Sequence, residues 1–578
     1  MVLIYENKDK LSHPAGDKKT KPEKSAEVQP DVSEIEESEG ALAPVVAQLL
    51  ENYKKELIAS RREYTPIHVD EIASRLSKFY EKIRKVVDWK DDNALRRNAI
   101  ERVLKRVLFP KVTGITPAEI RTEDLAKVIT MDLIRAGHLP NDAVPREKIE
   151  ILASALSKYT VFLENVNSYK TFEVKERINY TTFILEIASC EIEEVLTDPF
   201  KEYGVIDAMT KTMDERITVV TKEPVSPEFK RMQVFVATCR ALYDLDDNFI
   251  IYRLLSNTTP GWSNMTKDEA HKLSKRLPEL WARYTLEINL PISHKILRIC
   301  RKIDTIFILI DDILEKLKAK PKELQGVFEN KEKFTEIVKE QYEARYSTLK
   351  TRLFRLAMFS TLSVFLSNWV TFYIVEVPLA KLFYEGFNWV ATVVDFLVPT
   401  IVMFLMVAFI RPPGPENAEK VVNSVLGFIY KDEKKEKFQI TLSSKRPSLF
   451  RIFMLALYIE TILVVFGLIA YVFYIARLPI TSVIFDTFTI ALTVFAAVGI
   501  KNKSLELNVD EHTSVKDFIL DTISVPIARV GAFLARKWKE YNIIAIFFNF
   551  VIETPFSILL DFIQGWSEYI KERREEIL

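Results

Sequence analysis

Residues 452–474 read IFMLALYIETILVVFGLIAYVFY, an apolar run with a single charged side chain, Glu460. Three further runs of 20 or 21 residues have the same character. The four runs are Leu356–Val375, Val390–Ile410, Ile452–Tyr474 and Ile480–Ile500. A helix needs about 20 apolar residues to cover about 30 Å of hydrocarbon, and a soluble core helix of that length would show a regular polar face. The runs therefore predict four membrane spans.

The charges between the runs predict how the spans are oriented. The loop Arg411–Arg451 holds nine Lys and Arg residues, whereas the loop Glu376–Trp389 holds only Lys381, and only Arg477 separates the last two runs. Loops rich in Lys and Arg stay on the cytoplasmic side. We therefore expect a multi-pass protein of the cytoplasmic (inner) membrane with two hairpins, and with the charged loop and both termini in the cytoplasm. The first residues show no signal-peptide pattern, which is consistent with this orientation.

Composition predicts an all-α fold. The 578 residues include only 14 glycines, about 2.4% against a usual ~7%. Strand-rich folds need glycine in hairpins and bulges, and nucleotide-binding loops need it for close backbone approach. The motifs G-x-G-x-x-G and G-x-x-x-x-G-K-[ST] do not occur in the sequence. The net charge is zero, so no strongly acidic or basic partner is implied for the whole chain.

Helical periodicity divides the chain into five parts. The expected parts are a disordered tail over 1–40, a helical cytosolic domain over 41–328, a connecting helix over 329–352, a transmembrane region over 353–500 with the cytoplasmic loop 411–451, and paired amphipathic helices over 513–578. The expected helices of the cytosolic domain are Ala43–Arg61, Val69–Val87, Ala94–Leu108, Pro117–Ala136, Arg146–Asn165, Val174–Leu196, Pro227–Leu255, Lys267–Ile288 and Ile292–Lys318. Gly137, followed by Pro140, is the expected C-cap of one of them.

The C-terminal region has two interpretations. Polar residues recur every three to seven positions along an otherwise apolar stretch from Asn542 to Glu568, and a similar stripe passes through Asp517, Asp521 and Ser524. Such stripes favour a pair of amphipathic helices on the cytoplasmic leaflet. The alternative is a third hairpin whose polar stripes are buried against the other spans.

Several short stretches carry a resemblance to a known group of proteins. They are Val69-Asp-Glu-Ile-Ala-Ser, Lys78-Phe-Tyr-Glu-Lys-Ile-Arg, Leu95-Arg-Arg-Asn-Ala-Ile-Glu-Arg, Leu133-Ile-Arg-Ala-Gly-His-Leu-Pro, Arg411-Pro-Pro-Gly-Pro-Glu-Asn and Phe550-Val-Ile-Glu-Thr-Pro-Phe. Together they resemble an uncharacterised family of large multi-span membrane proteins from small-genome candidate-phylum bacteria. The resemblance implies a similar architecture and transfers no function.

Three acidic residues, Asp395, Glu460 and Asp486, lie inside the apolar runs. A charge at the centre of a bilayer costs about 2.5–3.5 kcal/mol, and no Lys or Arg inside the runs can pair with these acids. They can form a protonatable or cation-binding site, or they can be protonated acids that hydrogen-bond neighbouring helices. Both interpretations remain open at the level of sequence.

A second candidate is a basic face on the expected helix Ala94–Leu108. Its members are Arg96, Arg97, Arg102, Lys105 and Arg106. Clustered Lys and Arg can bind the phosphates of anionic lipids or nucleic acids. The alternative is a helix face whose charges pair with acids elsewhere in the domain. No zinc finger, RNP signature or aromatic platform accompanies the face, so sequence-specific nucleic-acid binding is not expected.

Other chemistry is not indicated. The histidines stand alone, no nucleophile elbow occurs, and Cys190, Cys239 and Cys300 are expected to be small buried hydrophobes. Neither a cofactor, a metal nor an enzymatic activity is therefore expected. The preferred function is a membrane-anchored helical scaffold that binds a protein partner or a second copy at the cytoplasmic face. The alternative is an ion or solute conduit that uses the three acids and is regulated by the cytosolic domain.

Overall fold

The computed structural model describes most of the chain between residues 42 and 540. The described residues are 42–59, 64–69, 95–112, 121–166, 169, 172–221, 224–371, 373–374, 377–378, 389–410, 412–430, 437–441, 448–475, 480–508, 515–540, 562, 566, 569–570 and 573–574. Three expected segments lie outside them wholly or mostly: the disordered tail, most of the helix Val69–Val87, and most of the second half of the C-terminal region.

The described chain is mostly helical, as predicted. It is 82% helix, with nineteen α-helices and one parallel pair of four-residue strands. The helices of the body, by which we mean residues 42–329, are α1 (Pro44–Ala59), α3 (Leu95–Val112), α4 (Thr122–Ala136), α5 (Glu147–Val166), α6 (Val174–Thr197), α7 (Phe200–Arg216), α8 (Pro227–Tyr243), α9 (Asp247–Thr258), α10 (Lys267–Ser274), α11 (Leu277–Glu287), α12 (Pro291–Cys300), α13 (Asp304–Leu317) and α14 (Leu324–Glu329). The helices beyond the body are α15 (Lys331–Thr371), α17 (Trp389–Ala408), α18 (Glu416–Ile429), α19 (Ser448–Ile475), α20 (Ile480–Ser504) and α21 (Val515–Glu540).

Local capping signals set several of the helix ends. Gly137 follows α4 with φ of 79°, and its N–H donates to the carbonyls of Leu133 and Ile134. This confirms the predicted C-cap, because a left-handed residue at this position is usually glycine. At the start of α8 the hydroxyl of Ser226 accepts from the N–H of Phe229, ahead of Pro227 at the first helical position.

Three helices that the sequence predicts as continuous are each broken in two. The first becomes α8 and α9, separated at Asp244, which has φ of 49°. The side chain of Asp246 then caps α9 by accepting from the N–H of Phe249, 2.9 Å away. The other two breaks fall between α10 and α11 and between α12 and α13. Each break lets the following segment fold back on the body.

Two described segments of the expected cytoplasmic loop 411–451 pack against the body. Strand β2 (Phe438–Thr441) pairs in parallel with β1 (Ile217–Val220), with Ile217 opposite Phe438. Helix α18 buries Val421, Val425 and other apolar residues in the same hydrophobic core as the body. Two segments about 220 residues apart in sequence therefore share one core.

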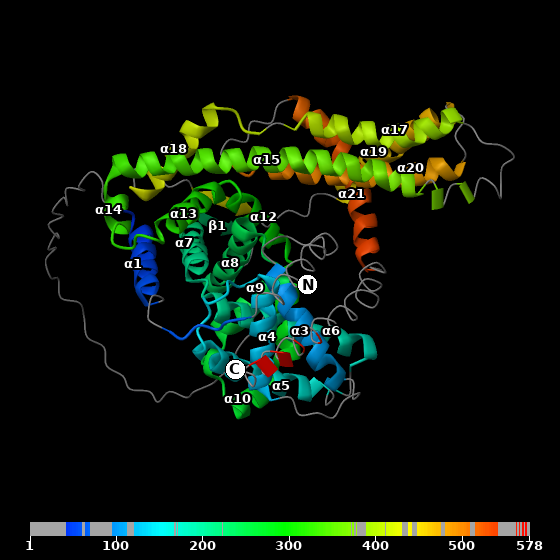
Figure 1. Ribbon diagram of the computed structural model, residues 1–578. Coiled ribbons are helices and arrows are strands. Elements are labelled where there is room, and N and C mark those ends of the chain that lie inside the picture. The colour runs from blue at the N-terminus through cyan, green and yellow to red at the C-terminus, as the bar shows by residue number, and fades with distance from the viewer. Residues whose placement is uncertain are drawn as a thin grey trace, which may run out of the picture.

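Helix α15 joins the body to the apolar helices without a break (Figure 1). Its first part buries Phe334, Val338 and Tyr342 against the body. Its last part carries exposed apolar residues: Phe354, Met358, Phe359, Leu362, Leu366, Trp369 and Val370. The predicted connecting helix and the first apolar run are thus one helix of 41 residues.

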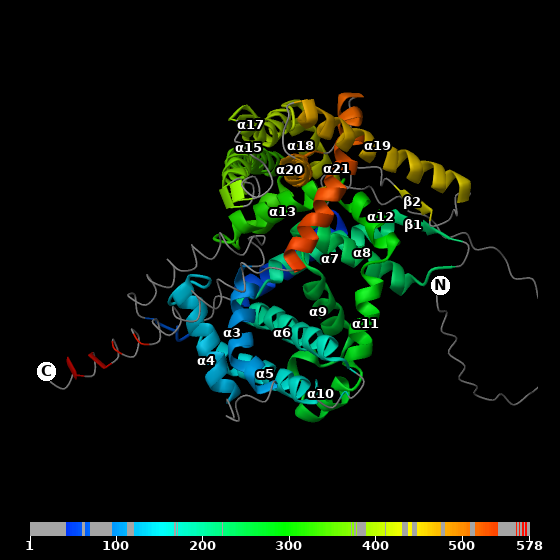
Figure 2. The same cartoon turned by 90° about the vertical axis from the view of Figure 1, so that its right-hand side faces the viewer.

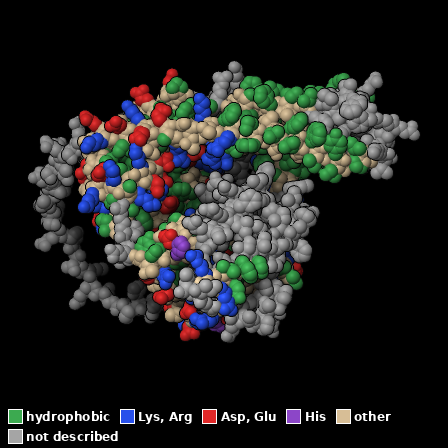
Figure 3. All heavy atoms as spheres, in the orientation of Figure 1, with side chains coloured by type: hydrophobic (Ala, Val, Ile, Leu, Met, Phe, Trp, Pro, Cys, Tyr) green, Lys and Arg blue, Asp and Glu red, His purple; other side chains and the backbone are tan. Residues whose placement is uncertain are grey.

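The apolar helices gather beyond the body. Figure 2 views α15, α17 and α20 nearly end-on, whereas α19 runs sideways and away from them. In Figure 3 apolar side chains cover this part of the molecule, and Lys, Arg, Asp and Glu are concentrated over the body. Helix α21 packs on α20, where Ile527 and Ala528 are buried with Ile490 and Ala491.

Two helices, not four, pass a test of length and hydropathy for membrane spans within the described residues. They are Lys331–Val370 and Ile452–Ile475. The apolar part of α17 is shorter, Leu397–Ala408, because the side chains before Leu397 lie outside the described residues. Helix α20 carries polar residues among its apolar ones, including the buried Asp486 and Thr493. The prediction of four spans is therefore corrected to two helices that satisfy the test.

Candidate functional site

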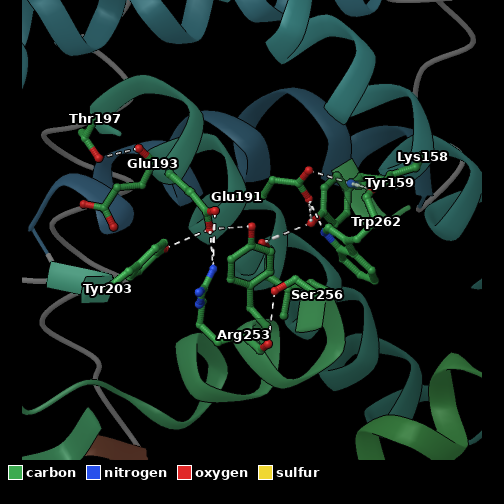
Figure 4. A network of polar contacts seen from close by, with 12 residues as sticks. Lys158, Tyr159, Glu191, Glu193, Thr197, Tyr203, Arg253, Ser256 and Trp262 are labelled. Carbon is green, nitrogen blue, oxygen red and sulfur yellow. Dashed lines mark hydrogen bonds and ion pairs between the residues drawn. The ribbon is translucent and has the colours of Figure 1, made fainter. Parts of the chain in front are cut away.

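The most elaborate polar cluster in the body surrounds Glu191 on α6 (Figure 4). The ammonium of Lys158, on α5, lies 2.6 Å from one carboxylate oxygen of Glu191. The hydroxyl of Tyr159 and the indole N–H of Trp262 both donate to the other oxygen, at 2.6 and 2.8 Å. Lys158 also donates to the backbone carbonyl of Trp262 at 2.6 Å. The side chains of Lys158 and Glu191 are only 1% and 4% exposed.

The next two acids of α6 have separate cationic partners. The carboxylate of Glu193 forms ion pairs with Arg97, at 3.1 Å, and with Arg96, at 3.6 Å. Glu194 lies 3.3 Å from the guanidinium of Arg253 and accepts from the hydroxyls of Tyr203 and Tyr252, at 2.9 and 2.8 Å. The acids of α6 thereby connect it with the helices α3, α5, α7 and α9. We call Lys158, Tyr159, Glu191, Glu194 and Trp262, together with the partners of Glu194, the α6 cluster.

Burial dominates the electrostatics of the α6 cluster. It raises the pKa of Glu191, opposed by Lys158, and lowers the pKa of Lys158, opposed by Glu191. Each group therefore favours the charged form of the other and opposes the effect of burial. Every polar atom of the Glu191 carboxylate has a partner, as a buried network requires. This arrangement is suited to fixing helices relative to one another.

Little in the sequence predicts this cluster. Glu191 and Glu193 look ordinary in a chain with 80 acidic residues. The one available signal was Lys158, which lies three residues after Ala155 and four before Phe162, on the apolar face of α5. A lysine at such a position needs a buried acidic partner, but its identity depends on the packing of α6.

The basic face of α3 is largely paired with acids. Arg97 is 7% exposed and lies 2.7 Å from Asp246 as well as near Glu193. Lys105 pairs with Glu101 at 2.5 Å, and Arg106 pairs with Asp132 at 2.9 Å. The remaining members, Arg96 and Arg102, also have interaction partners. These ion pairs agree with the alternative of a paired helix face, and phosphate binding by this face stays a prediction that we do not develop.

The three acids of the apolar runs have different environments. Asp486, on α20, is only 4% exposed, whereas Glu460, on α19, is exposed. The side chain of Asp395, on α17, lies outside the described residues. The described geometry therefore singles out Asp486 as the buried acid of the set.

The junction between the body and the apolar helices is held by a second polar cluster. The guanidinium of Arg345, on α15, lies 2.6 Å from Asp312 on α13 and 3.1 Å from Glu506, just after α20. The carbonyl of Glu506 accepts from the hydroxyl of Thr305 at 3.1 Å. The side-chain amide of Asn417 donates to the carbonyl of Leu507 at 2.6 Å. These contacts fix the end of α20 to both the body and α18.

Asp304 lies beside this junction, and its environment predicts a pH dependence of stability. Burial raises its pKa to about 7, reinforced by Glu506 and opposed by Thr305 and Arg301. Because the folded-state pKa exceeds the unfolded value of 3.8, the folded chain binds the proton more tightly, and stability is lost as pH rises from about 4 through about 7. The substitution Asp304→Asn removes this loss of stability. The loss is at most about 4 kcal/mol, because one pKa unit corresponds to ~1.4 kcal/mol.

This prediction is checked by thermal unfolding of the purified chain at pH 5 and pH 8. The Asp304→Asn variant should gain stability over the natural chain at both pH values, and the gain should be clearly larger at pH 8 than at pH 5. The substitution Asp268→Asn, at an exposed position in α10, is the control and should show no such pH-dependent gain. Equal effects of the two substitutions at both pH values would contradict the prediction.

Two pockets lie along the apolar helices. One, of about 440 Å³, is bounded by α17, α20 and α21 and includes the ion pair of Lys501 with Asp521, at 2.7 Å. The other, of about 710 Å³, lies between α15 and α17. Ile410 and Pro412, at the corner after α17, line both.

The described residues show neither a metal cluster nor a reactive thiol. No group of three or more His, Cys, Asp or Glu among them is placed to hold a metal ion. Cys190, Cys239 and Cys300 are free and buried, as predicted, and burial raises the pKa of each thiol.

Comparison with known proteins adds no function. No family model, curated protein or solved structure matches the chain. The α6 cluster, the junction and the two pockets are therefore the features from which its function is inferred.

Proposed function

We propose that the chain is an integral membrane protein that holds its helical body rigidly at the cytoplasmic face, where the body binds a protein partner or a second copy of the chain. Helix α15 carries this proposal, because one continuous helix is buried in the body at its start and exposes apolar residues at its end. A flexible linker would let the body turn freely, whereas a helix packed on the body fixes its orientation. A fixed orientation suits a scaffold.

Contacts that bring the chain back to the body support two membrane hairpins. After α17 the chain returns, since the N–H of Ala43 donates to the carbonyl of Ile429 at 2.8 Å and Lys295 donates to the carbonyl of Thr441 at 2.8 Å. After α20 it returns again, where Arg345 binds Glu506. Each excursion begins and ends on the same side, so each contains an even number of crossings. The two helices that satisfy the span test, α15 and α19, lie in different excursions. The proposal therefore requires that α17 and α20 also cross the bilayer and complete the two hairpins, as the loop charges predict.

Membrane extraction and cysteine labelling test the proposal. The protein should stay in the membrane pellet after alkaline carbonate treatment, because its apolar helices span the bilayer. In intact cells a membrane-impermeant maleimide should label Lys381→Cys and Arg477→Cys and should leave Lys420→Cys unlabelled until lysis. Release by carbonate would overturn the membrane assignment, and external labelling at position 420 would overturn the hairpin topology.

The scaffold role is tested by purification from the native cells in detergent, with a sizing run. We expect a stoichiometric protein partner or a homo-oligomer that persists after residues 1–40 are removed. A monomer without a bound protein would contradict the scaffold role while leaving the membrane assignment untouched.

A conduit is the second candidate, and the burial of Asp486 favours it. A carboxylate inside an apolar helix bundle is costly and often marks an ion or proton pathway. Asp486→Asn should then abolish ion or proton flux into liposomes that contain the purified protein. Glu460→Gln, at an exposed position, is the matched control and should leave the flux unchanged. Flux that is absent, or equal in all three proteins, would exclude this role for Asp486.

A further inference from the structure

The groove between α15 and α17 has the composition of a lipid site. Its walls are apolar and include Phe354, Met358, Leu362 and Phe404, which are 67%, 49%, 48% and 60% exposed. Ala357 lies among them, and its small side chain leaves space between the larger residues. The volume of about 710 Å³ is sufficient for a long hydrocarbon chain.

One cationic side chain lies at the end of the groove that is nearer the body. Lys350 is exposed, lines the groove, and has no acidic partner within the described part of the chain. The only other polar side chains in the lining belong to threonines 361 and 400, and Thr361 already donates to the carbonyl of Ala357 at 2.9 Å. The groove is therefore apolar along its length and positively charged at one end.

The spacing of these residues matches one leaflet of a bilayer. Ten helical residues rise about 15 Å, half of the ~30 Å hydrocarbon core. The interval from Phe354 to Phe365 in α15 covers this distance, and Lys350 lies one turn outside it, on the side of the body. An acyl chain in the groove would thus place its headgroup phosphate beside Lys350.

We propose that this groove binds one acyl chain of an anionic phospholipid of the cytoplasmic leaflet, with the lipid phosphate paired to Lys350. The proposal rests on the membrane assignment made above. It commits to a lipid because the groove lies within the exposed apolar surface of α15 and α17, part of the apolar region seen in Figure 3. The groove also ends at Lys350, which has no acidic partner among the described residues. A bound lipid would fill the space between the two helices and stabilise their packing.

Native mass spectrometry of the full chain, released from nanodiscs of equal phosphatidylglycerol and phosphatidylcholine, tests the proposal. We expect one retained phospholipid per chain, enriched in phosphatidylglycerol. Lys350→Gln should lower that enrichment about fivefold, since one basic residue near a membrane surface contributes about that factor. Arg355→Gln, on the same helix but outside the groove lining, is the matched control and should leave it unchanged. Ala357→Trp should fill the groove and abolish retention of both lipids.

Each failure has a distinct meaning. Failure to enter nanodiscs would contradict the membrane assignment. Entry without a retained lipid, equal retention of both lipids, or equal effects of the Lys350 and Arg355 substitutions would overturn the lipid site alone. A dimer that dissociates on Ala357→Trp, with no retained lipid, would identify a second copy as the occupant and would also overturn the proposal.

Discussion

Replacing Lys158 by methionine is expected to lower the free energy of unfolding of the body by about 3–5 kcal/mol, because it leaves the buried carboxylate of Glu191 without its cation. The two side chains are 1% and 4% exposed, so water cannot replace the lost ammonium. The packing volume changes little, which isolates the electrostatic effect. Thermal unfolding of the purified protein, followed by circular dichroism, measures the loss.

The loss should also depend on pH. Without Lys158, burial raises the pKa of Glu191 unopposed by that ammonium, while the unfolded value stays near 4.5. Stability is then lost as pH rises through the raised folded-state pKa, so the deficit should be larger at pH 8 than at pH 5. The double variant Lys158→Met with Glu191→Gln should recover part of the loss, since it removes the unpaired charge.

The control is an ion pair of the same type on the surface. Lys55 and Glu51 lie 2.6 Å apart with side chains 70% and 65% exposed. Lys55→Met should leave stability almost unchanged, because water solvates the remaining carboxylate. If Lys158→Met and Lys55→Met have equal effects, the α6 cluster does not hold the body together.

Gly531→Ala is expected to separate α21 from α20 and to cost about 1–3 kcal/mol, as overpacking does. A Cβ atom at Gly531 would lie 2.1 Å from the carbonyl oxygen of Ala491 and 2.8 Å from Cβ of Phe495. The backbones must move apart, because both obstacles are close to or part of the main chain. The loss should appear although alanine favours a helix over glycine by about 1 kcal/mol.

Limited trypsin digestion and thermal unfolding in detergent measure this effect. A separated α21 should be cut faster at Lys516 and Arg529, and the unfolding temperature should fall. Gly499→Ala in α20 is the matched control, since no atom lies within 4 Å of its added Cβ, and it should leave both quantities unchanged or raise the stability. Unaltered digestion of the Gly531 variant would contradict the close packing of these helices.

Much of the secondary structure follows from signals local in the sequence. The observed α1, α5 and α6 begin and end within about two residues of the expected helices. The C-cap at Gly137 was predicted because glycine adopts a left-handed conformation without a Cβ clash. The apolar surface of α15 and α19 also follows from composition alone. These properties depend on residues within a few turns of one another.

The breaks within the longer helices were missed, although the N-cap Asp246 is a local signal for one of them. Asp244 and Lys275 interrupt patterns that remain apolar on one face across the break. A periodic pattern reports which residues are buried, and it does not report where the chain turns to bury them. Helix α7, of 17 residues, was missed as well, although α1, α8 and α13 pack on it.

The sequence by itself determined that this protein is helical, that Gly137 ends a helix, and that long apolar helices follow a charged N-terminal half. It predicted four such spans, and two helices of the described residues satisfy the test. Only the tertiary structure decided that segments of the loop 411–451 pack against the body, that most cations of the basic face of α3 pair with acids, and that Lys158 meets Glu191. The physical reason is how far apart in the sequence the interacting residues lie. Helix formation and apolar character arise between neighbours along the chain, whereas strand pairing and buried ion pairs join residues tens to hundreds of positions apart.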